Sequence, residues 1–85
     1  MFNKNDLISG FCEGWKTGKG SNLVIKGQDL VNYNTVIARR DRENNQMLIN
    51  KKYYSSTTTR NTNLVREYSR YMGLEIVEVE AEELN

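Results

Sequence analysis

An expected strand gives way to an expected helix within one stretch, Asn50-Lys51-Lys52-Tyr53-Tyr54-Ser55-Ser56-Thr57-Thr58-Thr59-Arg60-Asn61-Thr62-Asn63. Its hydroxyls, amides and three cations surround the free backbone N–H groups of a helix start. This composition is typical of a helix N-terminus that captures a phosphate or another anion. Helix capping combined with strand propensity is the alternative interpretation of the Ser55–Thr59 run.

The segment that follows this stretch has a helical period. Its apolar side chains share one helical face: Leu64, Val65, Tyr68, Tyr71 and Met72. The pattern predicts a helix over residues 58–72, capped by Ser56, Thr57 or Thr58. Gly73 ends it, because glycine readily adopts the left-handed backbone that follows many helices.

Short strand patterns precede the stretch. Residues 23–25 and 30–33 flank a turn at Gly27 and predict one hairpin, and residues 35–39 and 46–50 predict a second. A further strand is expected over residues 74–79. Its apolar residues change face between Ile76 and Val77, so either both faces of this strand are covered or a bulge intervenes.

An amphipathic helix is expected near the N-terminus, over residues 4–14. Its apolar face comprises Leu7, Ile8, Phe11, Cys12 and Trp15. Asn5 or Asp6 can cap this helix and Gly14 can end it, although Gly10 inside it costs about 1 kcal/mol. The face is expected to pack on the core, and a partner-binding face is the alternative.

Together these elements predict a single small α+β domain with an antiparallel sheet of two hairpins plus a C-terminal strand. Residues 1–21 are expected to form the first helix and a flexible Gly/Lys connector, residues 22–80 the sheet and longer helix, and residues 81–85 a frayed acidic tail. The expected core consists of Leu23, Ile25, Val36, Ala38, Leu48, Leu64, Tyr68, Tyr71, Met72 and Ile76.

Composition limits the function. The 85 residues are 38% hydrophobic and carry a net charge of +1, so a partner or a homodimer would add burial to a small core. The chain has one cysteine, Cys12, and no histidine, which argues against a zinc site and a nucleophile–histidine pair. We therefore expect no enzyme, cofactor or metal. No segment has the roughly 20 apolar residues of a membrane span, and a cytoplasmic protein is expected.

The charges are distributed unevenly along the chain. Eight cations and three anions lie between Arg39 and Arg70, and cations alternate there with tyrosines. Tyrosines can stack on bases while cations hold phosphates, so the sequence predicts binding of nucleic acid or a phosphorylated ligand. The expected contact residues are Arg39, Lys51, Lys52, Tyr54, Thr57, Thr58 and Arg60. Half-buried tyrosines and solvated charges are the alternative interpretation.

The end of the chain is acidic, with five glutamates and no cation from Leu74 onward. Regularly spaced carboxylates can imitate a nucleic-acid backbone and block a basic groove on another protein. Glu75, Glu78 and Glu80 are the expected contacts in that case. A strand edge protected from aggregation by its charges is the other interpretation.

Two motifs resemble a family of small phage and prophage proteins of unknown function. Its members carry Leu-x-Ser-Tyr-x-Thr-x-Ile-Ala, which matches residues 30–38 except that Asn32 replaces serine, and Tyr-Ser-x-Thr-Thr, which matches residues 54–58. The resemblance covers residues 22–72 and implies a phage origin and a host-cell cytoplasmic location, but no activity. It makes an anti-defence inhibitor, such as an anti-CRISPR that binds a host effector protein, the alternative to nucleic-acid binding.

Overall fold

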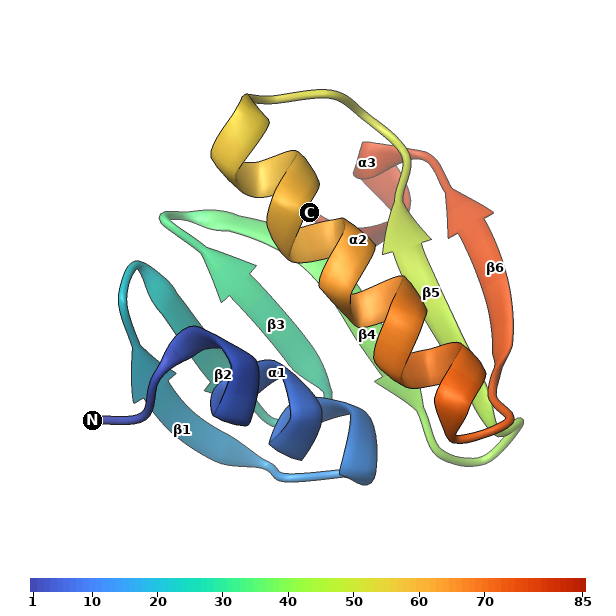
Figure 1. Ribbon diagram of the computed structural model, residues 1–85. Helices are drawn as coiled ribbons and strands as arrows, with labels where there is room; N and C mark the ends of the chain where they lie inside the picture. The colour runs from blue at the N-terminus through green and yellow to red at the C-terminus, as the bar shows by residue number, and fades with distance from the viewer.

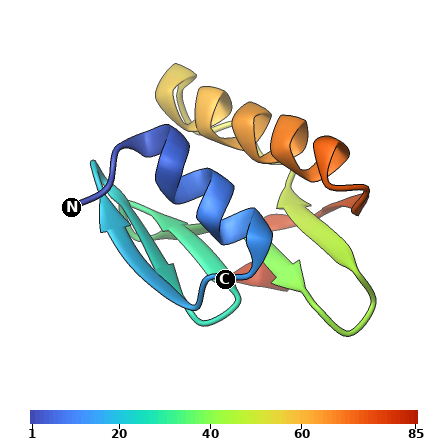
Figure 2. The same ribbon diagram turned by 60° about the horizontal axis from the view of Figure 1, so that its bottom comes forward.

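The computed structural model describes residues 1–85 and confirms the α+β class. Six strands form one sheet in the order β1-β2-β3-β4-β5-β6, antiparallel except for the parallel β5–β6 pair. Helices α1 and α2 lie side by side on one face of the sheet (Figures 1 and 2). The elements are α1 (Lys4–Glu13), β1 (Thr17–Gly20), β2 (Leu23–Lys26), β3 (Asp29–Asn32), β4 (Thr35–Asp41), β5 (Gln46–Asn50), α2 (Ser56–Tyr71), β6 (Glu75–Val79) and α3 (Ala81–Leu84).

The core fills the space between the sheet and the two longer helices. Its buried members are Leu7, Ile8, Phe11, Cys12, Leu23, Ile25, Leu30, Ile37, Ala38, Met47, Ile49, Val65 and Leu74, with Leu64, Tyr68, Met72 and Ile76 packed against them. The expected core face of α1 is confirmed for Leu7, Ile8, Phe11 and Cys12, whereas Trp15 lies beyond the end of the helix and is 37% exposed. The N-cap of α1 is Asn3, whose side chain accepts a hydrogen bond from the Asp6 N–H, and not Asn5 or Asp6. Gly14 ends α1 in the left-handed region, with φ of 109°.

The Gly/Lys connector expected to be flexible is largely a strand, β1. It pairs with β2 in regular antiparallel register. A Cβ added at Gly18 would lie 2.7 Å from Leu7 Cδ1, and one added at Gly20 would lie 2.6 Å from the Phe2 carbonyl oxygen. The two glycines therefore let the N-terminal segment and α1 approach the sheet closely, and they do not mark a linker.

Two expected core residues on the sheet face away from the helices. The register of β3 and β4 shifts between Leu30 and Val31, so that Ile37 and Ala38 are both buried while Val36 is only half-buried. A bulge of this kind places consecutive side chains on the core side, which an alternating pattern does not anticipate. On β5 the buried side chains are Met47 and Ile49, and Leu48 points to the other face.

Tyr71 is the third correction to the expected core, because it is 90% exposed. Helix α2 begins earlier than predicted: its N-cap is Ser55, whose Oγ accepts a hydrogen bond from the Thr58 N–H at 3.2 Å. Gly73, with φ of 75°, follows the helix as expected.

The C-terminal residues expected to form a frayed tail are ordered as the short helix α3, on the sheet face opposite α1 and α2. Leu84 is 5% exposed. The Val36 N–H donates to Asn85 Oδ1 at 2.8 Å, and Asn85 Nδ2 donates to the Val36 carbonyl at 3.2 Å. The β5–β6 register is regular, so the change of face at Val77 reflects a strand with apolar side chains on both faces and not a bulge.

Candidate functional site

Three exposed tyrosines lie at the end of the sheet where α2 begins. Figure 1 shows the β3–β4 turn and the segment between β5 and α2 at this same end. Tyr33, in the turn, is 61% exposed, and Tyr53 and Tyr54 are 69% and 36% exposed. Tyr33 has a positive φ of 58°, as the tight turn requires. A hollow of about 410 Å³ opens here, lined by Asn34, Thr35, Lys52, Tyr54, Ala81, Glu82 and Asn85.

The segment that carries Lys52 and Tyr54 is held by the buried Asn50. Asn50 Nδ2 donates to the Tyr54 hydroxyl at 3.0 Å and to the Val36 carbonyl at 3.1 Å. Asn50 Oδ1 accepts from the Lys52 N–H at 3.0 Å. The Lys52 ammonium lies 5.3 Å from the centre of the Tyr54 ring, within the range of a cation–π contact. The Asn50 amide therefore holds the Tyr54 hydroxyl and the Lys52 backbone, and the Lys52 ammonium contacts the Tyr54 ring at the rim of the hollow.

A buried polar cluster holds the start of α2 against β3. The Thr58 hydroxyl donates to Asn32 Oδ1 at 2.8 Å, and Asn61 Nδ2 approaches the same oxygen at 3.4 Å. Asn32 Nδ2 donates to the Asn22 carbonyl at 3.0 Å. Thr58 was predicted as a ligand contact, but its buried hydroxyl is occupied by Asn32. Sequence reasoning missed Asn32 as the partner, because the two residues are distant in the chain.

Two of the predicted cations are already paired. Arg39 contacts Asp29 at 2.6 and 3.2 Å on the sheet face opposite α2, and this hydrogen bonding raises the pKa of its guanidinium. The Lys51 ammonium lies 2.6 Å from Glu80, and the hydrogen bond to Glu80 raises the pKa of Lys51. The Asp29–Arg39 ion pair could have been predicted from the pairing of the strands, because the two residues are register partners on β3 and β4.

The remaining predicted contacts are open to solvent. Thr57 and Arg60 are exposed in the first two turns of α2, and Lys52 is exposed before it. Neither Lys52 nor Arg60 forms an ion pair. The structure thus leaves Lys52, Tyr54, Thr57 and Arg60 available at one end of the molecule. It adds the exposed rings of Tyr33 and Tyr53 to them, and we call the following set the tyrosine face: Tyr33, Lys52, Tyr53, Tyr54, Thr57 and Arg60.

The three predicted acidic contacts each have a polar partner. Glu75 accepts a hydrogen bond of 2.7 Å from Gln46 Nε2. Glu78 lies 2.8 Å from Arg66, and Glu80 pairs with Lys51. Two of the three carboxylates pair with cations and the third with a neutral amide, so they do not form an unpaired acidic row.

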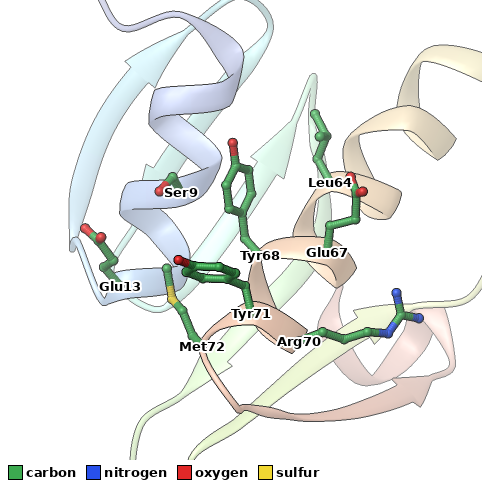
Figure 3. A pocket seen from close by; sticks show the side chains of 8 residues that line it. All are labelled: Ser9, Glu13, Leu64, Glu67, Tyr68, Arg70, Tyr71 and Met72. Atoms are coloured by element: carbon green, nitrogen blue, oxygen red, sulfur yellow. The ribbon is translucent and has the colours of Figure 1, made fainter.

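The largest hollow lies on another side of the molecule, between α1 and α2. Its volume is about 740 Å³, and Figure 3 shows its lining: Ser9, Glu13, Leu64, Glu67, Tyr68, Arg70, Tyr71 and Met72. We call it the α1–α2 groove. From the sequence, the apolar residues of this groove were expected only to pack in the core.

Comparison of the chain with protein-family models, with curated proteins and with solved structures found no match. The resemblance to phage proteins therefore stays a prediction. None of the helices combines the length and the apolar character needed to cross a bilayer.

Proposed function

We propose that the protein is a non-enzymatic module that binds single-stranded nucleic acid at the tyrosine face. The observation that supports this proposal is the presence of three exposed tyrosine rings and two unpaired cations at one end of the molecule, with Lys52 in contact with the Tyr54 ring. Tyr33, Tyr53 and Tyr54 are all at least 36% exposed, and they come from two separate segments of the chain. Lys52 and Arg60 lack acidic partners. Tyrosines in a core role would have their rings buried.

Stacking supplies most of the affinity in this proposal. Each base stacked on an aromatic ring is worth about 1–3 kcal/mol and shows little sequence preference. Unpaired, flexible strands offer such bases, whereas a duplex keeps them stacked inside. The site is thus suited to single-stranded nucleic acid. With only two unpaired cations it has little affinity for the phosphate backbone of a duplex.

In this proposal, the phosphates contact Lys52, Arg60 and the start of α2. The free N–H groups of the first helical turn carry a partial positive charge that favours an anion, and the exposed Thr57 hydroxyl can donate to it. Glu82 lines the same hollow as Lys52 and opposes this contact. Two cations predict a weak salt dependence, with a logarithmic slope of about −1 to −2.

The test is fluorescence anisotropy with labelled single-stranded and double-stranded oligonucleotides at low and moderate salt. We expect binding of the single strand, a loss of affinity for Tyr53→Ala and Lys52→Glu, and unchanged affinity for Tyr71→Ala. Tyr71 is a matched control, because it is 90% exposed but lies in the α1–α2 groove. Undetectable binding at low salt, or equal losses in all three variants, would rule out the tyrosine face.

Inhibition of a host defence protein is the second candidate. The acidic residues predicted for it already have partners, so the α1–α2 groove is the surface that favours a protein partner.

A further inference from the structure

The α1–α2 groove combines an apolar floor with an exposed aromatic rim. Leu64, Tyr68 and Met72 are partly buried and pack against the core. Tyr71 stands at the rim with 90% of its surface exposed, and Figure 3 shows its ring directed toward the α1 side of the groove. Aromatic residues and methionine are enriched at the centres of protein interfaces, and a large exposed ring beside an apolar floor is typical of a docking site.

Carboxylates line both walls of this groove. Glu13 comes from α1 and Glu67 from α2, and neither forms an ion pair. The one cation of the lining, Arg70, extends away from α1 in Figure 3. With two carboxylates and one cation, the lining carries a net charge of −1, and Glu13 is its charged residue on α1.

Figures 1 and 2 show α1 and α2 running in the same direction, so their C-terminal ends lie at the same end of the groove. A helix C-terminus carries a partial charge of about −0.5, and a nearby cation is stabilised there. Arg40 Nε donates to the Cys12 carbonyl in the last turn of α1 at 3.1 Å, and Arg70 lies in the last turn of α2. Both C-terminal ends therefore have a cation beside them, and the helix dipoles add little to the charge of the groove.

A smaller hollow on the other side of Glu13 has the same chemistry. It has a volume of about 260 Å³ and shares Ser9 and Glu13 with the α1–α2 groove. Phe2 and Trp15 line it, with ring centres 5.0 Å apart, together with Asp6. Aromatic faces flanked by carboxylates attract lysine and arginine side chains by cation–π and ionic contacts.

We propose that the α1–α2 groove docks a basic amphipathic segment of a partner protein. An apolar side chain of the segment packs on Leu64, Tyr68 and Met72, while its lysine or arginine side chains contact Glu13 and Glu67. This surface is separate from the tyrosine face, and the proposal does not depend on nucleic-acid binding. A second copy of the chain is a poor occupant, because a two-fold contact would bring the same carboxylates of two copies together.

The experiment starts with a displayed library of amphipathic peptides, selected on the intact protein and counter-selected on the Tyr71→Ala variant. We expect the enriched peptides to carry an excess of lysine and arginine. One enriched peptide is then titrated by calorimetry against the unmodified protein and against the variants Glu13→Lys, Glu67→Lys and Glu43→Lys. Glu43 is the matched control, because it is an exposed carboxylate in the turn between β4 and β5.

Reversing the charge of Glu13 or Glu67 should lower the affinity of the peptide roughly tenfold or more. Reversing the charge of Glu43 should leave that affinity unchanged. Circular dichroism checks that each variant remains folded. Failure to enrich any peptide, enrichment without basic residues, or equal losses in all three variants would each overturn the proposal. So would a dimer in light scattering that Tyr71→Ala dissociates, because the occupant would then be a second copy.

Discussion

The Thr58 hydroxyl donates a 2.8 Å hydrogen bond to Asn32 Oδ1 at the buried junction of α2 and β3. Asn32 is 2% exposed and also donates to the Asn22 carbonyl. Replacing Asn32 with alanine should lower the free energy of unfolding by about 1–3 kcal/mol, because it leaves buried polar groups without partners. Urea denaturation measures this. A loss no greater than that of an exposed control, Asn44→Ala, would contradict it.

The position of Trp15 against Gly10 explains a glycine inside α1. A Cβ at Gly10 would lie 2.2 Å from two atoms of the Trp15 ring. Glycine to alanine in a helix normally adds about 1 kcal/mol of stability, but Gly10→Ala should instead displace the ring. We expect a red-shifted emission of this single tryptophan and no gain in stability. In the Trp15→Ala background the same substitution should become stabilising, and equal effects in both backgrounds would contradict the packing.

Local periodicity predicted α2 and both hairpins, because a helical or alternating pattern is contained within each segment. It did not predict β1, since Gly18 and Gly20 read as a linker until α1 is placed above them. The ion pairing of the cations could not be predicted from local sequence either. Lys51 is neutralised by Glu80, which is brought to it only by the parallel pairing of β5 and β6. A sequence can suggest basic residues for a binding site, but tertiary contacts determine which of them are already paired with acidic residues.

The buried thiol of Cys12 should remain unreactive in the folded protein. Its Sγ lies 3.9 Å from the Val65 carbonyl oxygen and 3.8 Å from Ser69 Oγ, and burial raises its pKa from 9.0 to about 11. Alkylation near pH 8 should therefore require unfolding. Mass spectrometry of the alkylated protein with and without denaturant measures this. Rapid labelling of the native protein would contradict the burial.

The same pKa predicts a loss of stability in alkali. Because the folded pKa is raised, the folded state holds the proton more tightly, and the stabilisation is fully present below about pH 9. It should decrease as the pH rises from about 9 to about 11. Cys12→Ala lacks this contribution, although it loses packing at every pH. Its deficit relative to the unmodified protein should shrink over that range in urea denaturation, and a constant deficit would contradict the assignment.

Removal of residues 81–85 should destabilise the protein by about 2–4 kcal/mol. Leu84 loses its burial, and the Val36 backbone loses both hydrogen bonds to Asn85. Asn85→Ala alone should cost about 1 kcal/mol. Thermal and urea unfolding measure both variants, with Glu82→Gln as a control that keeps α3. A truncated chain as stable as the full one would show that this segment contributes nothing to the fold.

Glu82 should limit nucleic-acid binding, because its carboxylate lines the same hollow as Lys52 and Tyr54. Phosphate that approaches Lys52 is repelled by this charge, so Glu82→Gln should strengthen binding of a single strand, by roughly a factor of two to five at low salt. The gain should diminish as salt screens the repulsion. Glu43→Gln removes an exposed carboxylate between β4 and β5, away from the hollow, and is the matched control. Anisotropy titrations of both variants distinguish local repulsion from net charge: an equal gain in both would place the nucleic acid elsewhere on the molecule, and a gain confined to Glu82→Gln would locate phosphate beside Lys52.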